Sequence, residues 1–254
     1  MSIIIDDLYS ELISQLGPIE QLKFRCTNRF HLNRINSDIL KELFDFKTNH
    51  SKDKINFINV CKFGHLNLAK WFYQLCVDIH AENEYAFRWS CQNGHIEVAK
   101  WLYEFDVDIH VENESAFIWT CASGRIEVSK WLYSLGDVNI HAENELAFRL
   151  SCGFGHIEVA KWLYELGVDV HAKNECAFMW SCRNGHIEIA KWLYELGNVN
   201  IHTNDESAFT SSCINGHIEV AKWLYELGAN IHIEDDYVFK ISPKQIIDWL
   251  NTIQ

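Results

Sequence analysis

The sequence predicts an all-α solenoid of stacked helix-turn-helix units joined by short hairpin links. The main observation is an internal repeat: Gly-His-Ile-Glu-Val-Ala-Lys-Trp-Leu-Tyr, residues 94–103, has six related copies. The turn glycines of these copies are 30, 30, 31, 30 and 31 residues apart: Gly64, Gly94, Gly124, Gly155, Gly185 and Gly216. Such a period is typical of units that bury their apolar faces only against their neighbours. Apolar residues within each copy also follow a helical spacing.

Residues 83–110 illustrate one unit of the repeat. Asn83 is expected to be the N-cap of a first helix, and Gly94 is expected to end it in the left-handed conformation. A second helix is expected from about Ile96 to Phe105. Asp108–His110 then forms a short extended link to the next unit.

The overall composition excludes several classes of partner. The chain has 254 residues, 48% apolar content and a formal charge of −13. Binding to nucleic acid or to an anionic membrane surface needs a basic face, so we expect neither partner. The first residues lack a basic segment followed by a long apolar run, so no signal peptide is expected.

Cysteine and histidine recur in phase with the repeat. Six of nine cysteines share one phase and are interpreted as buried free thiols in a reducing, intracellular compartment: Cys61, Cys91, Cys121, Cys152, Cys182 and Cys213. Equivalent residues of stacked units lie about 8–10 Å apart, whereas zinc ligands lie about 2.0–2.3 Å from one ion. We therefore expect no metal, no cofactor and no enzyme. The alternative hypothesis is a metal-dependent or thiol enzyme built from these columns.

The turn and the second helix resemble the ankyrin repeat. The run Ser181-Cys182-Arg183-Asn184-Gly185-His186, followed by Ala190, Leu193 and Gly197, matches that family's pattern. The resemblance covers residues 51–254: six full units and a truncated C-terminal capping unit. It implies a non-catalytic module that binds a partner protein in a concave groove. The shortened unit with Asn-Glu-x-Ala-Phe is similar to ankyrin repeats of giant DNA viruses of amoebae, which would place the protein in the host cytoplasm.

The chain also departs from the family's pattern. Tyr85–Arg88 stands where the family has Thr-Pro-Leu-His, so we expect asparagine caps such as Asn83 to replace that hydrogen-bond network. Cys76 and Asp106 replace the glycine that ends the second helix, which is expected to loosen those turns.

Tryptophan separates into two groups. Six recur in the second helix and are expected to seal the seams between units: Trp71, Trp101, Trp131, Trp162, Trp192 and Trp223. Three others, Trp89, Trp119 and Trp180, lie in the first helix, where equivalent residues include Asn59 and Ser211, so this position is not deep core. By the ankyrin resemblance such varied positions face the groove. The predicted partner-binding residues are Trp89, Trp119, Trp180, Arg88, Arg149, Tyr85, Phe63, Phe154 and Arg183.

Residues 1–43 break the period and are expected to form a separate helical segment. The stretch 4–16 resembles the opening of an F-box, and residues 24–30 and 37–43 resemble its close. As an F-box, the segment would bind a Skp-type adaptor of a cullin–RING ubiquitin ligase through Ile4, Ile5, Leu8, Leu12 and Leu16. As a cap, it would cover the first repeat. Both interpretations stay open, and in either case we expect a monomer.

Overall fold

The computed structural model describes residues 38–39, 41–42, 45, 56–232 and 237–253. The chain divides into two compact units, each of which is described by itself. The first comprises Met1–Thr120 and Glu127–Leu135, and the second comprises Cys121–Ile126 and Gly136–Gln254.

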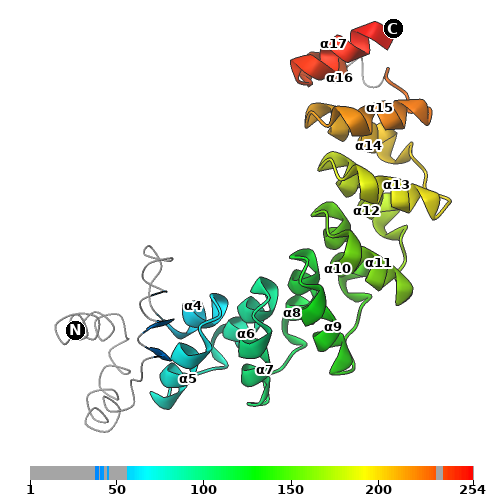
Figure 1. Ribbon diagram of the computed structural model, residues 1–254. Coiled ribbons are helices and arrows are strands. Elements are labelled where there is room, and N and C mark those ends of the chain that lie inside the picture. Colours follow the sequence, from blue (N-terminus) through cyan, green and yellow to red (C-terminus); the bar gives the residue numbers. More distant parts are fainter. Residues whose placement is uncertain (1–37, 40, 43–44, 46–55, 233–236, 254) are drawn as a thin grey trace. The chain divides into compact units, whose positions relative to one another are not determined.

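Paired helices make up residues 57–135 of the first unit, apart from the turns between them (Figure 1). The pairs are α4 (Phe57–Lys62) with α5 (Leu66–Gln74), α6 (Ala81–Asn93) with α7 (Ile96–Tyr103), and α8 (Val111–Ala122) with α9 (Ile126–Ser134). Helix α4 packs on α6, and α5 packs on α7. The last residues of α8 and the first residue of α9 are assigned to the second unit.

The second unit repeats the arrangement and ends with a shorter pair. Its helices are α10 (Ala142–Gly153), α11 (Ile157–Glu165), α12 (Ala172–Arg183), α13 (Ile187–Glu195), α14 (Thr203–Ile214), α15 (Ile218–Glu226), α16 (Tyr237–Ile241) and α17 (Lys244–Ile253). Helices α10, α12, α14 and α16 pack in sequence. The described residues contain no strand, so turns link the pairs and the all-α solenoid is confirmed.

The core is built from constant positions of the repeat. Phenylalanine of the first helix and leucine of the second are almost completely buried, as Phe148 and Leu163 illustrate. Four of the predicted seam tryptophans contact the preceding repeat: Trp101, Trp131, Trp192 and Trp223. The Trp192 ring lies edge-on to Phe148 and to Tyr164 of the preceding repeat, with centroid distances of 6.4 and 5.9 Å.

The turn glycines take the expected left-handed conformation, and their neighbours explain why only glycine fits. Gly64 has φ +81°, and a Cβ added there would lie 2.4 Å from the His95 ring of the next repeat. Gly124 and His156 repeat this contact. Burial lowers the pKa of His156, while a hydrogen bond to the Ala122 carbonyl opposes the shift.

The start of the first helix differs from the prediction. Asn83 is not an extended N-cap, because it lies with Glu82 and Glu84 in a left-handed turn with φ near +56°. Its side-chain amide donates to Glu112 of the next repeat instead of capping its own helix. A left-handed residue other than glycine costs roughly 1–2 kcal/mol, so three in succession need compensating contacts.

A histidine–glutamate pair spans each of these turns. In the first copy the His80 amide donates to Asp78 Oδ1, and His80 Nδ1 donates to Oε1 of the buried Glu84. The Nδ1–Oε1 distances are 2.7, 2.9, 2.7 and 2.9 Å in the first four copies. The copies are His80–Glu84, His110–Glu114, His141–Glu145, His171–Glu175 and His202–Glu206. We call this pair the His–Glu clasp. It gives these five recurring histidines a structural role.

Left-handed residues end the second helices whether or not glycine is present. Cys76 and Asp106 have φ +59° and +58°, and Gly167 has φ +95°. Cys76 and Asp106 therefore carry backbone strain that glycine would avoid. Helix α7 ends at Tyr103 instead of Phe105, because the chain turns at Glu104 and Phe105 before Asp106.

Candidate partner-binding surface

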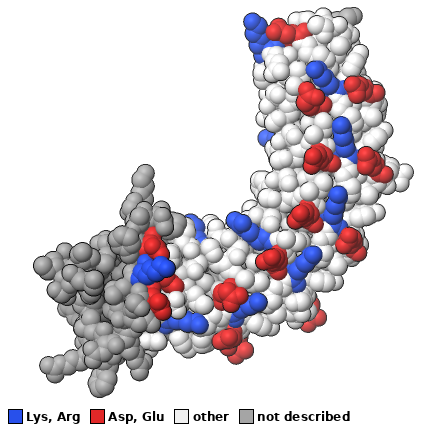
Figure 2. All heavy atoms as spheres, viewed as in Figure 1, with Lys and Arg blue, Asp and Glu red and all other residues white. Residues whose placement is uncertain are grey.

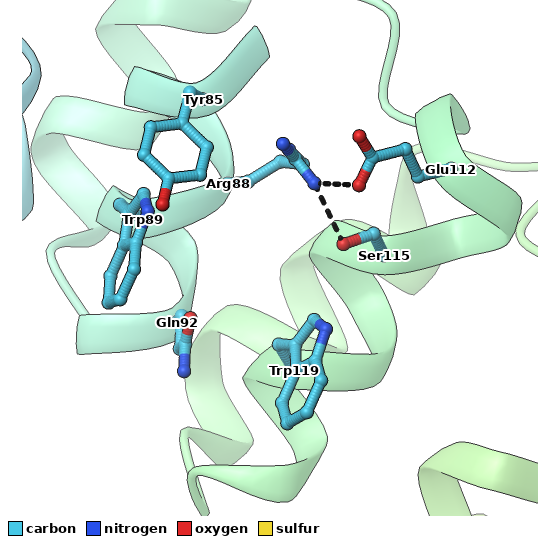
Figure 3. Close-up of a pocket in the computed structure, with 7 residues that line it drawn as sticks. All are labelled: Tyr85, Arg88, Trp89, Gln92, Glu112, Ser115 and Trp119. Atoms are coloured by element: carbon cyan, nitrogen blue, oxygen red, sulfur yellow. Dashed lines mark hydrogen bonds and ion pairs between the residues drawn. The ribbon is translucent and has the colours of Figure 1, made fainter. Parts of the chain in front are cut away.

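A cleft opens between α6 and α8 in the first unit (Figure 3). Its volume is about 340 Å³. The lining residues are Tyr85, Arg88, Trp89, Gln92, Glu112, Ser115 and Trp119. Figure 3 shows Trp89 and Trp119 on neighbouring helices, with Gln92 between them. We call this the first aromatic cleft.

One wall of the first aromatic cleft is held by charge. Arg88 Nη1 donates to a Glu112 carboxylate oxygen and to Ser115 Oγ, the latter at 3.2 Å. Hydrogen bonding from Asn83, supported by the Arg88 charge, lowers the pKa of Glu112. The Lys62 ammonium lies 4.6 Å from the Trp89 ring centroid, so one Trp89 face is already covered.

A second cleft lies between α10 and α12 in the second unit. Its volume is about 260 Å³, and its lining residues are Leu150, Gly153, Phe154, Trp180, Arg183 and Asn184. Gly153 makes room for the tryptophan, since a Cβ there would lie 3.2 Å from Trp180 Cβ. Asn184 Nδ2 donates to the Gly153 carbonyl at 2.6 Å and ties the two helices together. We call this the second aromatic cleft.

Comparison with known proteins identifies the repeat. A family model described as ankyrin repeats (3 copies) matches residues 57–144 and 146–235, more than half of the chain. The chain belongs to the ankyrin-repeat family. A crystal structure of the human ASB11 ankyrin repeat domain is similar, with a TM-score of 0.60 and 16% sequence identity. That similarity covers 79% of this chain and 98% of that one, and at this identity it shows the fold alone. A search of curated proteins found no match.

Ankyrin repeats are protein–protein interaction modules and typically act as non-catalytic scaffolds. The predicted partner-binding residues can be placed on this array. Trp119 and Phe154 are 43% and 52% exposed, and Arg183 is also exposed. Phe63, Tyr85, Arg88, Trp89 and Trp180 are half-buried.

Arg149 departs from the prediction of an exposed contact residue, because it is only 8% exposed. Its Nε and Nη2 donate to the carbonyls of Asn144 and Glu143, each at 2.8 Å. Its guanidinium also lies 5.5 Å from the Trp180 ring centroid. Arg149 therefore holds the left-handed turn by hydrogen bonds and lies against the Trp180 ring.

The sequence interpretation missed Glu112 as part of the first aromatic cleft. The signal was present, because the equivalent positions of the ankyrin array vary in charge: Glu82, Glu112, Glu143, Lys173 and Asn204. The proposed adaptor contacts Ile4, Ile5, Leu8, Leu12 and Leu16 lie outside the described residues.

The cysteine column is buried within the array. Burial raises the pKa of Cys213 to about 12 and raises those of Cys61, Cys91, Cys152 and Cys182 still further. Over the described ranges, no three His, Cys, Asp or Glu side chains are grouped so that they could hold a metal ion. In the same part of the chain, no helix is both long enough and apolar enough to span a bilayer.

Proposed function

We propose that the chain captures a partner protein on the concave side of the ankyrin array, through the two aromatic clefts. The observation that carries the proposal is the position of the aromatic residues. Trp89, Trp119 and Trp180 belong to a repeat phase that varies, while the constant phases form the core. Each cleft therefore combines a rigid wall with side chains that packing between repeats does not dictate.

The exposure of these aromatic residues supports a binding role. Trp119 and Phe154 leave large apolar surfaces in contact with solvent, which is unfavourable unless a partner covers them. Tryptophan is enriched among the residues that dominate the affinity of protein interfaces. Tyr85 lies edge-on to Trp89 at 5.6 Å, and the Lys62 ammonium lies 4.6 Å from the same ring centroid, so Trp89 is positioned before a partner arrives.

The test compares binding and stability in three variants of the full chain. Trp89→Ala with Trp119→Ala should weaken capture of partner proteins from cell lysate by about 2–4 kcal/mol or more in affinity. Leu102→Ala, at a position that is 0% exposed, should cost about 2–5 kcal/mol of folding stability. Tyr103→Ala is the matched control, because Tyr103 is 39% exposed and lies on the second helix outside the clefts.

Two results would contradict the proposal. Equal loss of capture in Tyr103→Ala and in the double tryptophan variant would remove the special role of the first aromatic cleft. Unfolding of the double variant under conditions where Leu102→Ala stays folded would mean that the tryptophans belong to the core.

We further propose, from the F-box resemblance, that residues 1–43 deliver the bound partner to a cullin–RING ubiquitin ligase. The similarity to ankyrin repeats of giant viruses supports action in a host cytoplasm. The described end of this segment contacts the first repeat: Ile39 is buried, and Glu42 accepts from the Leu68 amide at 2.8 Å and from Asn67 Nδ2 at 2.8 Å. This contact favours a capping role for residues 38–42.

Two truncations separate the adaptor from the cap. Removing residues 1–37 keeps Glu42 at the start of α5, whereas removing residues 1–42 deletes it. As an adaptor, the chain should lose Skp–cullin components in both truncations while the array stays folded. As a cap alone, it should recover none of these components even when intact, and the longer deletion should lower stability and promote aggregation.

A further inference from the structure

Arg88 and Arg149 occupy equivalent positions in two repeats. In the first unit, Arg88 Nη2 donates to the Glu82 carbonyl and Nη1 donates to Ser115 Oγ. In the second unit, Arg149 Nη2 donates to the carbonyl of residue 143, and Nη1 lies 3.6 Å from Cys176 Sγ. Each arginine therefore spans from its own left-handed turn to the helix of the next repeat.

The two sites differ in the charge that faces the arginine. Glu112 pairs with Arg88 in the first unit, and its equivalent beside Arg149 is Lys173. The backbone angles nearly coincide, with φ 53° and ψ 49° at Glu112 and φ 57° and ψ 46° at Lys173. The Cα–Cβ bonds at these positions are therefore directed alike, and a lysine replaces the carboxylate that balances Arg88.

Around α12, the second unit consequently has three positively charged side chains without an ion-pair partner among the described residues. Among those residues, no carboxylate lies within ion-pairing distance of Arg149, Lys173 or Arg183. Burying a guanidinium without a counter-ion is unfavourable, and among the described residues Arg149 is held by two carbonyl oxygens, the Cys176 sulfur and the Trp180 ring. This arrangement is notable in a chain with a net charge of −13.

The positive charges flank an apolar site. Trp180 lies on Gly153 and lines the second aromatic cleft, and Arg183 lines the same cleft one helical turn further on. Phe154 stands at the cleft and is 52% exposed. Lys173 and Arg149 lie toward the other end of α12, so cationic side chains occur on both sides of Trp180.

We propose that the second aromatic cleft binds a segment of a partner protein in which acidic residues flank an apolar side chain. The apolar side chain fills the cleft between Phe154 and Trp180. One carboxylate pairs with Lys173 above the buried Arg149 charge, in the role that Glu112 plays for Arg88, and another pairs with Arg183. This inference rests on the proposed function and names the chemistry of the partner segment.

The spacing of the cations limits the partner segment. Ten helical residues rise about 15 Å, an upper estimate for the separation of Lys173 and Arg183 along α12 because its first turn is left-handed. An extended segment covers this distance in about four or five residues. The expected motif is an apolar residue with an acidic residue about two positions away on each side.

The test measures binding of the full chain to labelled peptides by fluorescence anisotropy. The acidic probe carries glutamates on both sides of a phenylalanine. Matched probes replace the glutamates with glutamine or lysine, or the phenylalanine with serine. We expect the acidic probe to bind, and the glutamine and serine probes to bind about tenfold more weakly. The lysine probe should not bind, and added salt should weaken binding of the acidic probe.

Variants of the chain assign the effect to the site. Lys173→Glu and Arg183→Glu should each lower affinity for the acidic probe about tenfold. Lys191→Glu is the control, because it makes the same charge change on the exposed surface of α13, and affinity should be retained. Circular dichroism should show that all three variants keep their helical content.

Several outcomes would overturn the inference. These are no measurable binding of the acidic probe, equal binding of the glutamine probe, or equal effects of Lys191→Glu and Lys173→Glu. Full competition by a single-stranded oligonucleotide would also overturn it, because the site would then select phosphate. If Trp180→Ala abolishes capture of the partner while the charge reversals have no effect, this inference fails and the proposed function stands. If the charge reversals, Trp180→Ala and the double variant of Trp89 and Trp119 are all without effect, this inference and the proposed function both fail.

Discussion

Truncating the histidine of one His–Glu clasp should destabilise the array measurably. His141 Nδ1 donates to Glu145 Oε1 at 2.7 Å, and the Glu145 side chain is 9% exposed. Oε2 of Glu145 is buried and has no hydrogen-bond partner among the described residues. His141→Ala would therefore leave a nearly buried carboxylate with neither oxygen bonded to protein.

The expected cost follows from the loss of that partner. An unsatisfied buried polar group costs about 1–3 kcal/mol, and more when it is charged. The His141 side chain is 54% exposed, so water can reach part of the vacated site and reduce the penalty. We expect His141→Ala to lower the free energy of unfolding by about 1–2 kcal/mol.

The assay is urea unfolding of the full chain, followed by circular dichroism. Stability is compared at constant slope, since a change in slope would indicate that repeats unfold separately. A double-mutant cycle with Glu145→Ala isolates the clasp from the strain of placing alanine at φ +63°. Glu158→Ala on the exposed surface of α11 is the control and should stay within about 0.5 kcal/mol.

Two results of the double-mutant cycle would contradict the prediction for His141→Ala. If His141→Ala is as mild as Glu158→Ala, or if the coupling energy between His141 and Glu145 is zero, the clasp does not hold the turn. The left-handed residues would then be stabilised by packing between repeats alone.

Three other predictions concern the turns and the buried side chains. Gly167→Ala should cost about 1–2 kcal/mol from backbone strain alone, because a Cβ there meets nothing within 4 Å. Gly155→Ala should cost more, since its Cβ would lie 2.7 Å from an imidazole; equal urea midpoints would contradict this. Because burial lowers the pKa of His156, the unfolded chain binds protons more readily, so stability should be full above about pH 6.5 and should fall as the pH drops below it. A urea midpoint that rises on acidification would refute the assignment. The exposed Cys76 should be alkylated in the folded chain, while the buried Cys213 should react only after unfolding, as mapped by mass spectrometry.

Much of the fold follows from the repeat alone. The period locates every turn glycine, and helical spacing of apolar residues locates the second helix, because both depend on contacts that recur in each unit. The role of Trp192 at a seam follows in the same way. Even the shortened last pair was predictable, since Pro243 separates α16 from α17.

The left-handed turns were not predictable from local propensity. Asn83 before Glu84 is a favourable helix start in isolation, and local rules give no reason to place both residues at positive φ. The His80 imidazole bonds the buried carboxylate of Glu84, four residues later, across this turn, and local propensity takes no account of such a contact. Sequence spacing could have indicated it, because histidine and glutamate recur four residues apart in five consecutive repeats.

The burial of Arg149 could not be predicted for a related reason. Variation between repeats identifies positions that are not required for stacking, but it does not say whether a side chain points outward or folds back. Arg88 and Arg149 both fold back onto the left-handed turn, whose carbonyl oxygens accept their hydrogen bonds.

The left-handed turns also influence the chemistry of the clefts. The left-handed turn presents carbonyl oxygens that hold an arginine, and the held arginine lies near an aromatic ring, as Arg149 does at Trp180. The next repeat then supplies either a counter-ion, Glu112, or a second cation, Lys173. Because the backbone angles at Glu112 and Lys173 nearly coincide, this exchange reverses the charge that faces the arginine without redirecting the backbone. We therefore expect a substitution at this exposed position to change the charge of the partner segment that the repeat prefers.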